Sequence, residues 1–303
     1  MSFEVRPLPG GIGKEVLGLA LDGPVATDTA AALRTLWLDA GVVLFRGIGT
    51  SPEALLALSR CFGELEIHPI ERFRLPGYPE LILLTNRDGP SGPVYDFDGE
   101  PIHGRIPWHT DLAFTTTPNA GALLRMVQKT ATGGETGWLD TARAWDELDA
   151  ATKRRIEGLE AIYHFTGDLD EMRFNRPGGV RLTPKRGDYP HFPPVAHPLV
   201  WTHPETGRKV LNVSTLNIRG ILGLDEEEGD ALIEALIAHA LQPRFRYVHA
   251  WENDDIVLWD NRRTMHCAFG HPVAQVRIVQ RSTIRGTVAM GRILGEQREA
   301  TRA

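Results

Sequence analysis

The sequence has few cysteines, no excess of basic residues and no long apolar run. Two cysteines in 303 residues cannot form the disulfide framework of a small secreted protein, and they fit a reducing compartment. A net charge of −6 argues against a general nucleic-acid-binding role, which needs a basic surface. No apolar stretch approaches the roughly 20 residues that span a bilayer.

The N-terminal segment also lacks the charged region and apolar core of a secretory signal peptide. We therefore expect a cytoplasmic protein that binds neither nucleic acid nor membranes. The chain is 42% hydrophobic, so it can bury a full core, and no repeat or linker divides it. We expect one domain over residues 1–303, and a homo-oligomer is left open.

Hydrophobic patterns predict many strands and few helices. Helices are expected at residues 28–40, 51–63, 141–160 and 225–241. Strands are expected at residues 42–45, 81–85, 122–127, 198–202, 209–213, 245–251, 256–259 and 276–284. This content is typical of a mainly β protein with flanking helices, and we expect a double-stranded β-helix of the jelly-roll, cupin-like type.

A candidate metal site stands out near the middle of the chain. His109 and Asp111 are two residues apart, so on a strand both side chains point to one face. His266 can join them from another strand. Two imidazoles and one carboxylate leave three coordination positions open, which suits a non-heme Fe(II) that must hold a co-substrate and O2. A His-x-Asp pair alone is weak support in a chain with 11 histidines.

Two arginines follow the second histidine at a regular spacing. Arg277 comes eleven residues after His266, and Arg281 four residues later. The alternating residues around them predict a strand with both guanidiniums on one face. Two positive charges placed so close together need anionic partners.

These segments together resemble the taurine dioxygenase / 2,4-dichlorophenoxyacetate dioxygenase family of Fe(II)- and 2-oxoglutarate-dependent oxygenases. The similarity runs from about residue 5 to 287, and it also includes residues 60–68, 133–136, 197–207 and 259–262. The resemblance implies roles for seven side chains: iron ligands in His109, Asp111 and His266, anchors for the far carboxylate of 2-oxoglutarate in Thr136 and Arg277, and neighbours of the primary substrate in His68 and Arg281.

The implied reaction uses Fe(II), 2-oxoglutarate and O2, and it releases succinate and CO2. The expected substrate is a small organic anion, a carboxylate or sulfonate, and hydroxylation of a C–H bond is the default outcome. Two rival classes stay open: a metal hydrolase or isomerase with the same fold, and a jelly-roll protein that binds a small molecule without catalysis. Neither explains why Arg277 occurs together with Thr136.

Residues 86–107 show no regular pattern and are rich in glycine and proline. A structureless segment of that length in a compact domain is usually functional or disordered. Because it leads directly into the metal motif, we expect a substrate lid that carries Tyr95, Phe97 and His103. The alternative is an ordinary surface loop.

Further expectations concern residues around the site. The resemblance implies that the polar, proline-rich residues 166–194 cover the mouth of the active site. Residues 290–303 are expected to be a tail. Asp260 and Asn261 should fix the turn before the second histidine ligand. Cys267 should be a packed, inert thiol that faces away from the metal.

Overall fold

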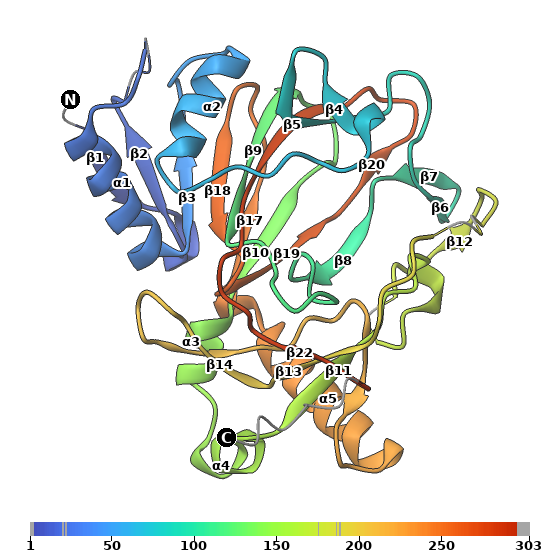
Figure 1. Ribbon diagram of the computed structural model, residues 1–303. Coiled ribbons are helices and arrows are strands. Elements are labelled where there is room, and N and C mark those ends of the chain that lie inside the picture. Colours follow the sequence, from blue (N-terminus) through green and yellow to red (C-terminus); the bar gives the residue numbers. More distant parts are fainter. Residues whose placement is uncertain are drawn as a thin grey trace.

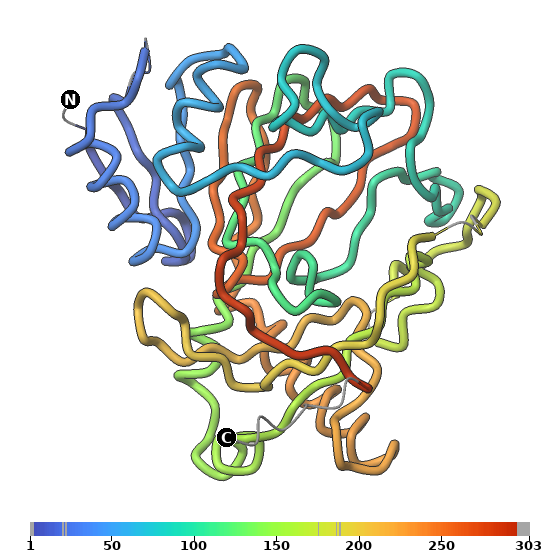
Figure 2. The backbone as a smooth tube through the Cα atoms, in the orientation of Figure 1, coloured from blue at the N-terminus to red at the C-terminus, as the bar shows by residue number. Residues whose placement is uncertain are grey.

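The computed structural model describes residues 3–19, 21, 23–174, 176–185, 187 and 189–295 (Figures 1 and 2). Two β-sheets form the centre of the fold. The larger sheet has the strand order β1-β2-β3-β18-β9-β21-β5-β4, and the smaller one has the order β17-β10-β19-β8. Apolar side chains from both sheets share one core, including Leu124, Met126, Trp138, Met265 and Val279.

The larger sheet is antiparallel except where β2 pairs with β3. Its strands are β1 (Glu4–Pro7), β2 (Lys14–Leu17), β3 (Val42–Phe45), β18 (Ile256–Asp260), β9 (Gly121–Gln128), β21 (Ile278–Ile284), β5 (Tyr78–Thr85) and β4 (Arg74–Leu75). The smaller sheet consists of β17 (Arg246–His249), β10 (Thr136–Asp140), β19 (Thr264–Ala268) and β8 (Ile106–His109).

Three further sheets complete the β structure of the described residues. The first has the order β16 (Ile218–Ile221), β11 (Glu160–Tyr163), β13 (Val195–Pro198) and β22 (Arg292–Ile293). The second has the order β12 (Val180–Arg181), β6 (Val94–Phe97), β7 (Glu100–His103) and β20 (His271–Pro272). The third is the hairpin β14 (Val200–Thr202) and β15 (Lys209–Leu211).

Each predicted helical region contains a helix, but one region is divided into two helices and several ends differ. The α-helices are α1 (Thr27–Ala40), α2 (Pro52–Arg60), α3 (Thr141–Asp146), α4 (Ala150–Ile156) and α5 (Glu226–Ala240), and short 3-10 helices occupy Pro9–Gly11, Glu71–Phe73, Leu169–Glu171 and Pro243–Phe245. The expected helix at 141–160 is two helices, because Asp140 and Asp149 each cap a separate N-terminus. The second predicted helix ends at Arg60 rather than at residue 63.

Helices α1 and α2 cover the outer face of the larger sheet (Figure 1). Strand β3 shows why this is possible, because successive side chains of a strand point to opposite faces. Leu44 belongs to the core between the sheets, whereas Val43 belongs to the cluster formed with Leu33 and Trp37 of α1. The short apolar run in β3 is therefore buried on both faces.

The expectation of a structureless loop at residues 86–107 is wrong. The segment forms the hairpin β6–β7 and leads into β8, and β6 also pairs with β12. Asp98 and Gly99 both have positive φ angles, 55° and 89°. An Asp-Gly pair between two strands is a strong hairpin signal, which the abundance of glycine and proline obscured.

Tyr95 does not face a substrate from this hairpin. Its side chain is buried, and its hydroxyl donates to Asp170 Oδ1 at 2.9 Å. The same carboxylate accepts from Arg181, which lies on β12. Strands β6 and β7 of the first segment and β12 of the second thus belong to one small sheet, so residues 94–103 are not the ordinary surface loop of the alternative.

The C-terminal segment is not wholly a tail. Residues Arg292–Ile293 form β22 and pair with β13, whereas residues 296–303 of the predicted tail lie outside the described residues. Among the described residues, no helix combines the length and the apolar character needed to cross a membrane.

Replacing Tyr95 by phenylalanine should lower the free energy of unfolding by ~1 kcal/mol, because a buried hydrogen bond is lost while the ring stays in place. Denaturant unfolding followed by circular dichroism measures the change. Tyr78→Phe is the matched control, since the Tyr78 hydroxyl contacts Glu53 at an exposed position. Equal stability of wild type and Tyr95→Phe would contradict the assigned contact.

Candidate active site

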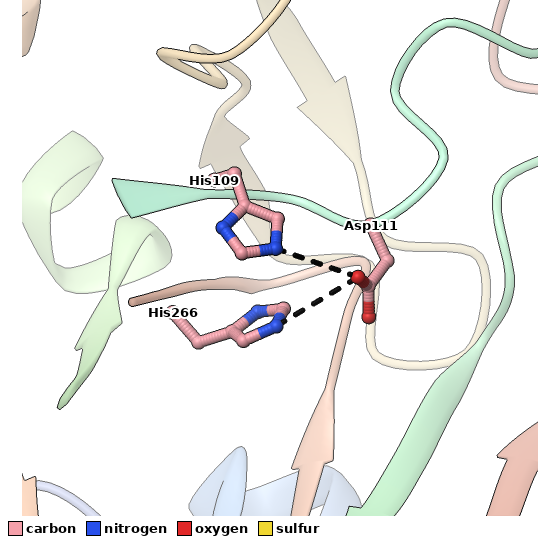
Figure 3. Close-up of side chains that lie close together, drawn as sticks. All are labelled: His109, Asp111 and His266. Atoms are coloured by element: carbon pink, nitrogen blue, oxygen red, sulfur yellow. Dashed lines mark ion pairs between the residues drawn. The ribbon is translucent and has the colours of Figure 1, made fainter. Parts of the chain in front are cut away.

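Strands β8 and β19 place the two candidate histidines opposite each other. His109 and His266 are direct partners in the antiparallel register, and their ring centroids are 4.2 Å apart. Asp111 lies two residues beyond the end of β8. Its Oδ1 atom is 3.5 Å from His109 Nε2 and 3.7 Å from His266 Nε2 (Figure 3). The candidate ligand atoms of these three residues all lie within 4.8 Å of one another, as a single metal ion requires.

The protonation of the histidines suits metal binding. His109 Nδ1 lies 2.8 Å from the Pro107 carbonyl oxygen, which can only accept, so Nδ1 donates there and Nε2 is the ring atom that faces the site. Burial lowers the pKa of His266 well below its ordinary value, and His109 adds to the effect. Two imidazoles and one carboxylate form a donor set that fits ferrous iron.

Asp111 is charged although its side chain is only 13% exposed. Burial alone would raise its pKa, but the Arg281 guanidinium and the two imidazoles hold the pKa well below its ordinary value. Arg281 Nη2 donates to Asp111 Oδ2 at 2.6 Å, whereas Oδ1 faces the histidines. Asp111 is therefore one of the anionic partners that the arginine pair was expected to need.

A cavity of about 370 Å³ adjoins these residues, and its lining includes both arginines and Thr136. Arg277 has one polar side-chain contact in the described chain, from Nη2 to the Gly134 carbonyl oxygen at 3.4 Å, and its buried Nε has no partner. Burial lowers the pKa of Arg277 to about 10. Thr136 Oγ1 accepts from Trp251 Nε1 at 3.0 Å, so its own proton is free to be donated.

The structure does not bring His68 to this cavity. The His68 side chain is half-buried, its Nδ1 accepts the Ile70 N–H at 3.1 Å, and its ring packs edge-on against Phe73. Among the three residues expected on a lid, only His103 lines the cavity. His271 also lines it, although the sequence analysis gave that residue no role. No local sequence signal marks His271, because its neighbours in the site come from distant segments.

Asn261 joins the two segments that carry the candidate ligands. Its Oδ1 accepts the backbone N–H of Asp111 at 2.9 Å, and its Nδ2 donates to the Asp111 carbonyl at 3.1 Å. Asn261 belongs to the turn between β18 and β19, and β19 contains His266. The side-chain amide therefore holds Asp111 against the turn, as the expectation for this residue required.

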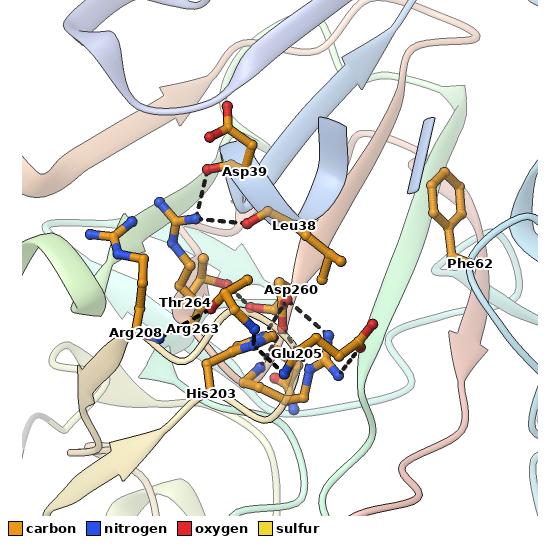
Figure 4. Close-up of polar contacts among 12 residues, drawn as sticks. Leu38, Asp39, Phe62, His203, Glu205, Arg208, Asp260, Arg263 and Thr264 are labelled. Carbon is orange, nitrogen blue, oxygen red and sulfur yellow. Dashed lines mark hydrogen bonds and ion pairs between the residues drawn. The ribbon is translucent and has the colours of Figure 1, made fainter. Parts of the chain in front are cut away.

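Asp260 anchors that turn to the rest of the protein (Figure 4). Its carboxylate accepts from His203 Nε2 at 2.9 Å and from Arg262, and its carbonyl accepts from Thr264. Burial would raise the pKa of Asp260, but His203 and Arg262 lower it to about 2. Next to it, Arg263 donates to two carbonyl groups at the end of α1. The turn before His266 is thus fixed by buried charges.

Cys267 is buried and has a pKa that burial raises to about 12, so its thiol stays protonated. A Cβ atom at Gly137 would lie 2.9 Å from its sulfur, which shows how closely the thiol packs against β10. This agrees with the expected packed thiol.

Replacement of any one of His109, Asp111 and His266 by alanine should remove most of the bound metal, because the described residues offer only these three ligands at the site. Metal content after loading with Fe(II) under anaerobic conditions, measured by elemental analysis, tests this. His68→Ala is the control and should keep the wild-type metal content. A variant of any of the three residues that retains full metal would exclude that residue from the site.

Comparisons with known proteins agree with this geometry. Residues 4–283 match the family described as taurine catabolism dioxygenase TauD, TfdA. The chain is 30% identical over 299 residues to an (S)-phenoxypropionate/alpha-ketoglutarate-dioxygenase from Sphingobium herbicidovorans, with 95% of this chain and 96% of the relative covered. It is 28% identical over 284 residues to an alpha-ketoglutarate-dependent 2,4-dichlorophenoxyacetate dioxygenase from Burkholderia sp. (strain RASC), with 90% and 91% covered.

Two solved structures have the same fold. A taurine dioxygenase from Burkholderia xenovorans is 29% identical, with a TM-score of 0.75 and with 95% of this chain and 93% of the other covered. AAD-2 in complex with Mn(II) and N-oxalylglycine is 27% identical, with a TM-score of 0.73 and coverage of 96% and 100%. The family expected from the motifs is confirmed: the chain belongs to the TauD/TfdA family of dioxygenases that depend on Fe(II), 2-oxoglutarate and O2.

Proposed function

We propose that His109, Asp111 and His266 bind the iron, that Arg277 with Thr136 holds the far carboxylate of 2-oxoglutarate, and that the enzyme hydroxylates a C–H bond of a small organic anion. The main support for the proposal is that Arg277 has no anionic partner of its own in the described part of the chain. This guanidinium is buried in the same cavity as the three ligands and has no carboxylate partner among the described residues. A buried charge without a partner is costly, so an anionic ligand is its natural complement.

The anchor explains how the co-substrate is oriented. A planar guanidinium can make two parallel, charge-assisted hydrogen bonds to a carboxylate. Thr136 can add a third through its free hydroxyl proton, because Trp251 already occupies one of its acceptor sites. The cavity volume of about 370 Å³ lies within the range of small-molecule sites.

Arg281 gives the two oxygen atoms of the Asp111 carboxylate different contacts. Because Oδ2 is held by Arg281, Oδ1 is the oxygen with which Asp111 would hold the metal. Trp259 packs against both His266 and Arg281: its ring lies 4.8 Å from the His266 ring and 5.3 Å from the Arg281 guanidinium carbon. When bound, the iron and 2-oxoglutarate supply the activation of O2, and succinate and CO2 are the products.

Charge also supports an anionic primary substrate. Both Arg277 and Arg281 line the cavity, and Asp111 is the carboxylate that pairs with one of them. Arg281 Nε is buried without a partner, so the guanidinium retains hydrogen-bonding capacity. The names of the relatives refer to phenoxypropionate and 2,4-dichlorophenoxyacetate, both carboxylates, and that of a structural neighbour to taurine, a sulfonate.

We further propose that the two central sheets form a double-stranded β-helix within a single domain. The shared apolar core between them supports this, as does the continuous match to the family over residues 4–283. Helices α1 and α2 then lie outside the barrel, against the larger sheet.

The proposed function predicts that organic acids, and not their neutral analogues, stimulate the release of succinate. A panel of phenoxyalkanoic acids and alkyl sulfonates, each compared with its amide or sulfonamide, can be tested with Fe(II) and 2-oxoglutarate under air. Succinate and O2 uptake are measured together. Stimulation by an acid above its amide supports the proposal, and a neutral compound that surpasses every acid would contradict the anionic substrate class.

Arg277→Leu should sharply raise the concentration of 2-oxoglutarate needed for turnover, because losing one partner of a buried charged pair costs on the order of 2–5 kcal/mol. Arg277→Lys should recover only part of this loss, since an ammonium cannot reproduce the two-pronged contact. The half-saturating 2-oxoglutarate concentration is the readout. Arg285→Leu is the control at an exposed arginine near the end of β21. An unchanged requirement in Arg277→Leu would place the anchor elsewhere.

A further inference from the structure

A second pair of histidines lines the cavity. His103 on β7 and His271 on β20 are direct partners in the antiparallel register, with ring centroids 5.5 Å apart at an angle of 85°. Both residues are buried, at 7% and 4% exposure, and both line the cavity that contains Arg277. Strand β7 of the hairpin and strand β20 therefore supply a polar wall of the site.

Not all ring nitrogens of this pair have hydrogen-bond partners. His103 Nδ1 is buried without a hydrogen-bond partner, and neither ring pairs with a carboxylate in the described part of the chain. His271 Nδ1 donates to the Pro272 carbonyl at 3.1 Å, which fixes its tautomer. A buried polar atom without a partner in a native protein calls for an explanation, and a missing ligand is one. His103 is the member of the pair with an unassigned N–H.

The pair lies at the Arg277 end of the cavity. Arg277 Nη2 contacts the Gly134 carbonyl, and the Gly134 N–H donates to Gly270, the residue before His271, at 2.8 Å. The pKa of His103 also reflects the nearby charge of Arg277. Burial lowers the pKa of His103 to about 4, and His271 and Arg277 contribute further. His103 is therefore neutral at pH 7, and one of its ring nitrogens carries an N–H that is available for donation.

We propose that His103 is a further binding residue for 2-oxoglutarate, whose imidazole N–H donates to the far carboxylate beside Arg277, with His271 orienting the ring by its edge-to-face contact. The inference rests on the proposed role of Arg277 as the anchor for that carboxylate. Its consequence is selectivity, because a donor directed at the far carboxylate favours a dicarboxylic 2-oxo acid over a monocarboxylic one. The β6–β7 hairpin would thus contribute directly to the choice of co-substrate.

The test compares two ligands that have the same 1-carboxylate and 2-keto groups, with which they chelate a metal. The first is 2-oxoglutarate, and the second is 2-oxopentanoate, which has the same chain length and a methyl group in place of the far carboxylate. Dissociation constants are measured by calorimetry on the full chain loaded with Mn(II) under anaerobic conditions, so no turnover is involved. His103→Phe keeps an aromatic ring but removes the N–H. His103→Gln restores a donor, and His103→Leu is a second variant without one.

His103→Phe and His103→Leu should weaken 2-oxoglutarate binding on the order of tenfold and leave 2-oxopentanoate unchanged, as expected for one lost hydrogen bond to a charged acceptor. His103→Gln should regain part of the loss. If either folded variant without a donor keeps the wild-type preference while Arg277→Leu loses it, the inference fails and the proposed function stands. Equal weakening of both ligands would also overturn it, because His103 would then act on the metal end. Retention of the preference by Arg277→Leu itself would refute the proposed anchor.

Discussion

Asp111 keeps its charge inside the protein because Arg281 Nη2 lies 2.6 Å from one of its oxygens. Without that guanidinium, burial would favour the protonated acid, and a protonated carboxyl group is a poor metal ligand. The pair also separates the two oxygens, since Oδ2 faces Arg281 while Oδ1 faces the histidines. One ion pair therefore sets both the charge and the orientation of the carboxylate.

The second constraint is strand register. His109 and His266 face each other across β8 and β19, and a slip of one residue would turn one imidazole to the opposite face of the sheet. Asn261 and Asp260 make such a slip costly. The first binds both backbone groups of Asp111, and the second holds the turn between β18 and β19 through buried charged contacts. The positions of the three candidate ligands are well defined, because hydrogen bonds connect the segment of Asp111 to the turn before His266 and connect that turn to α1.

The sequence was informative where local spacing determines geometry. The His-x-Asp pair and the later histidine predicted three residues whose candidate ligand atoms lie close together in the structure, since an interval of two residues constrains side-chain direction. Contacts between distant segments could not be read in this way. The pairing of Arg281 with Asp111 and that of His103 with His271 depend on which strands become neighbours, and no residue interval encodes that.

Composition and resemblance each led to one error. The glycine and proline content of residues 86–107 suggested a loop, although the Asp98–Gly99 turn pointed to a hairpin. The resemblance put His68 beside the substrate, whereas its ring lies outside the cavity, against Phe73. The first error concerned the secondary structure of the segment, and the second concerned the contacts of one side chain.

A crystal structure of this protein with Mn(II) and N-oxalylglycine would test the central claim most directly, since AAD-2 has been crystallised with the same two ligands. The account predicts that the metal contacts His109, His266 and Asp111 Oδ1, that Arg281 still pairs with Oδ2, and that the far carboxylate of the ligand contacts Arg277. Binding of the metal through other side chains, or a far carboxylate that points away from Arg277, would contradict it.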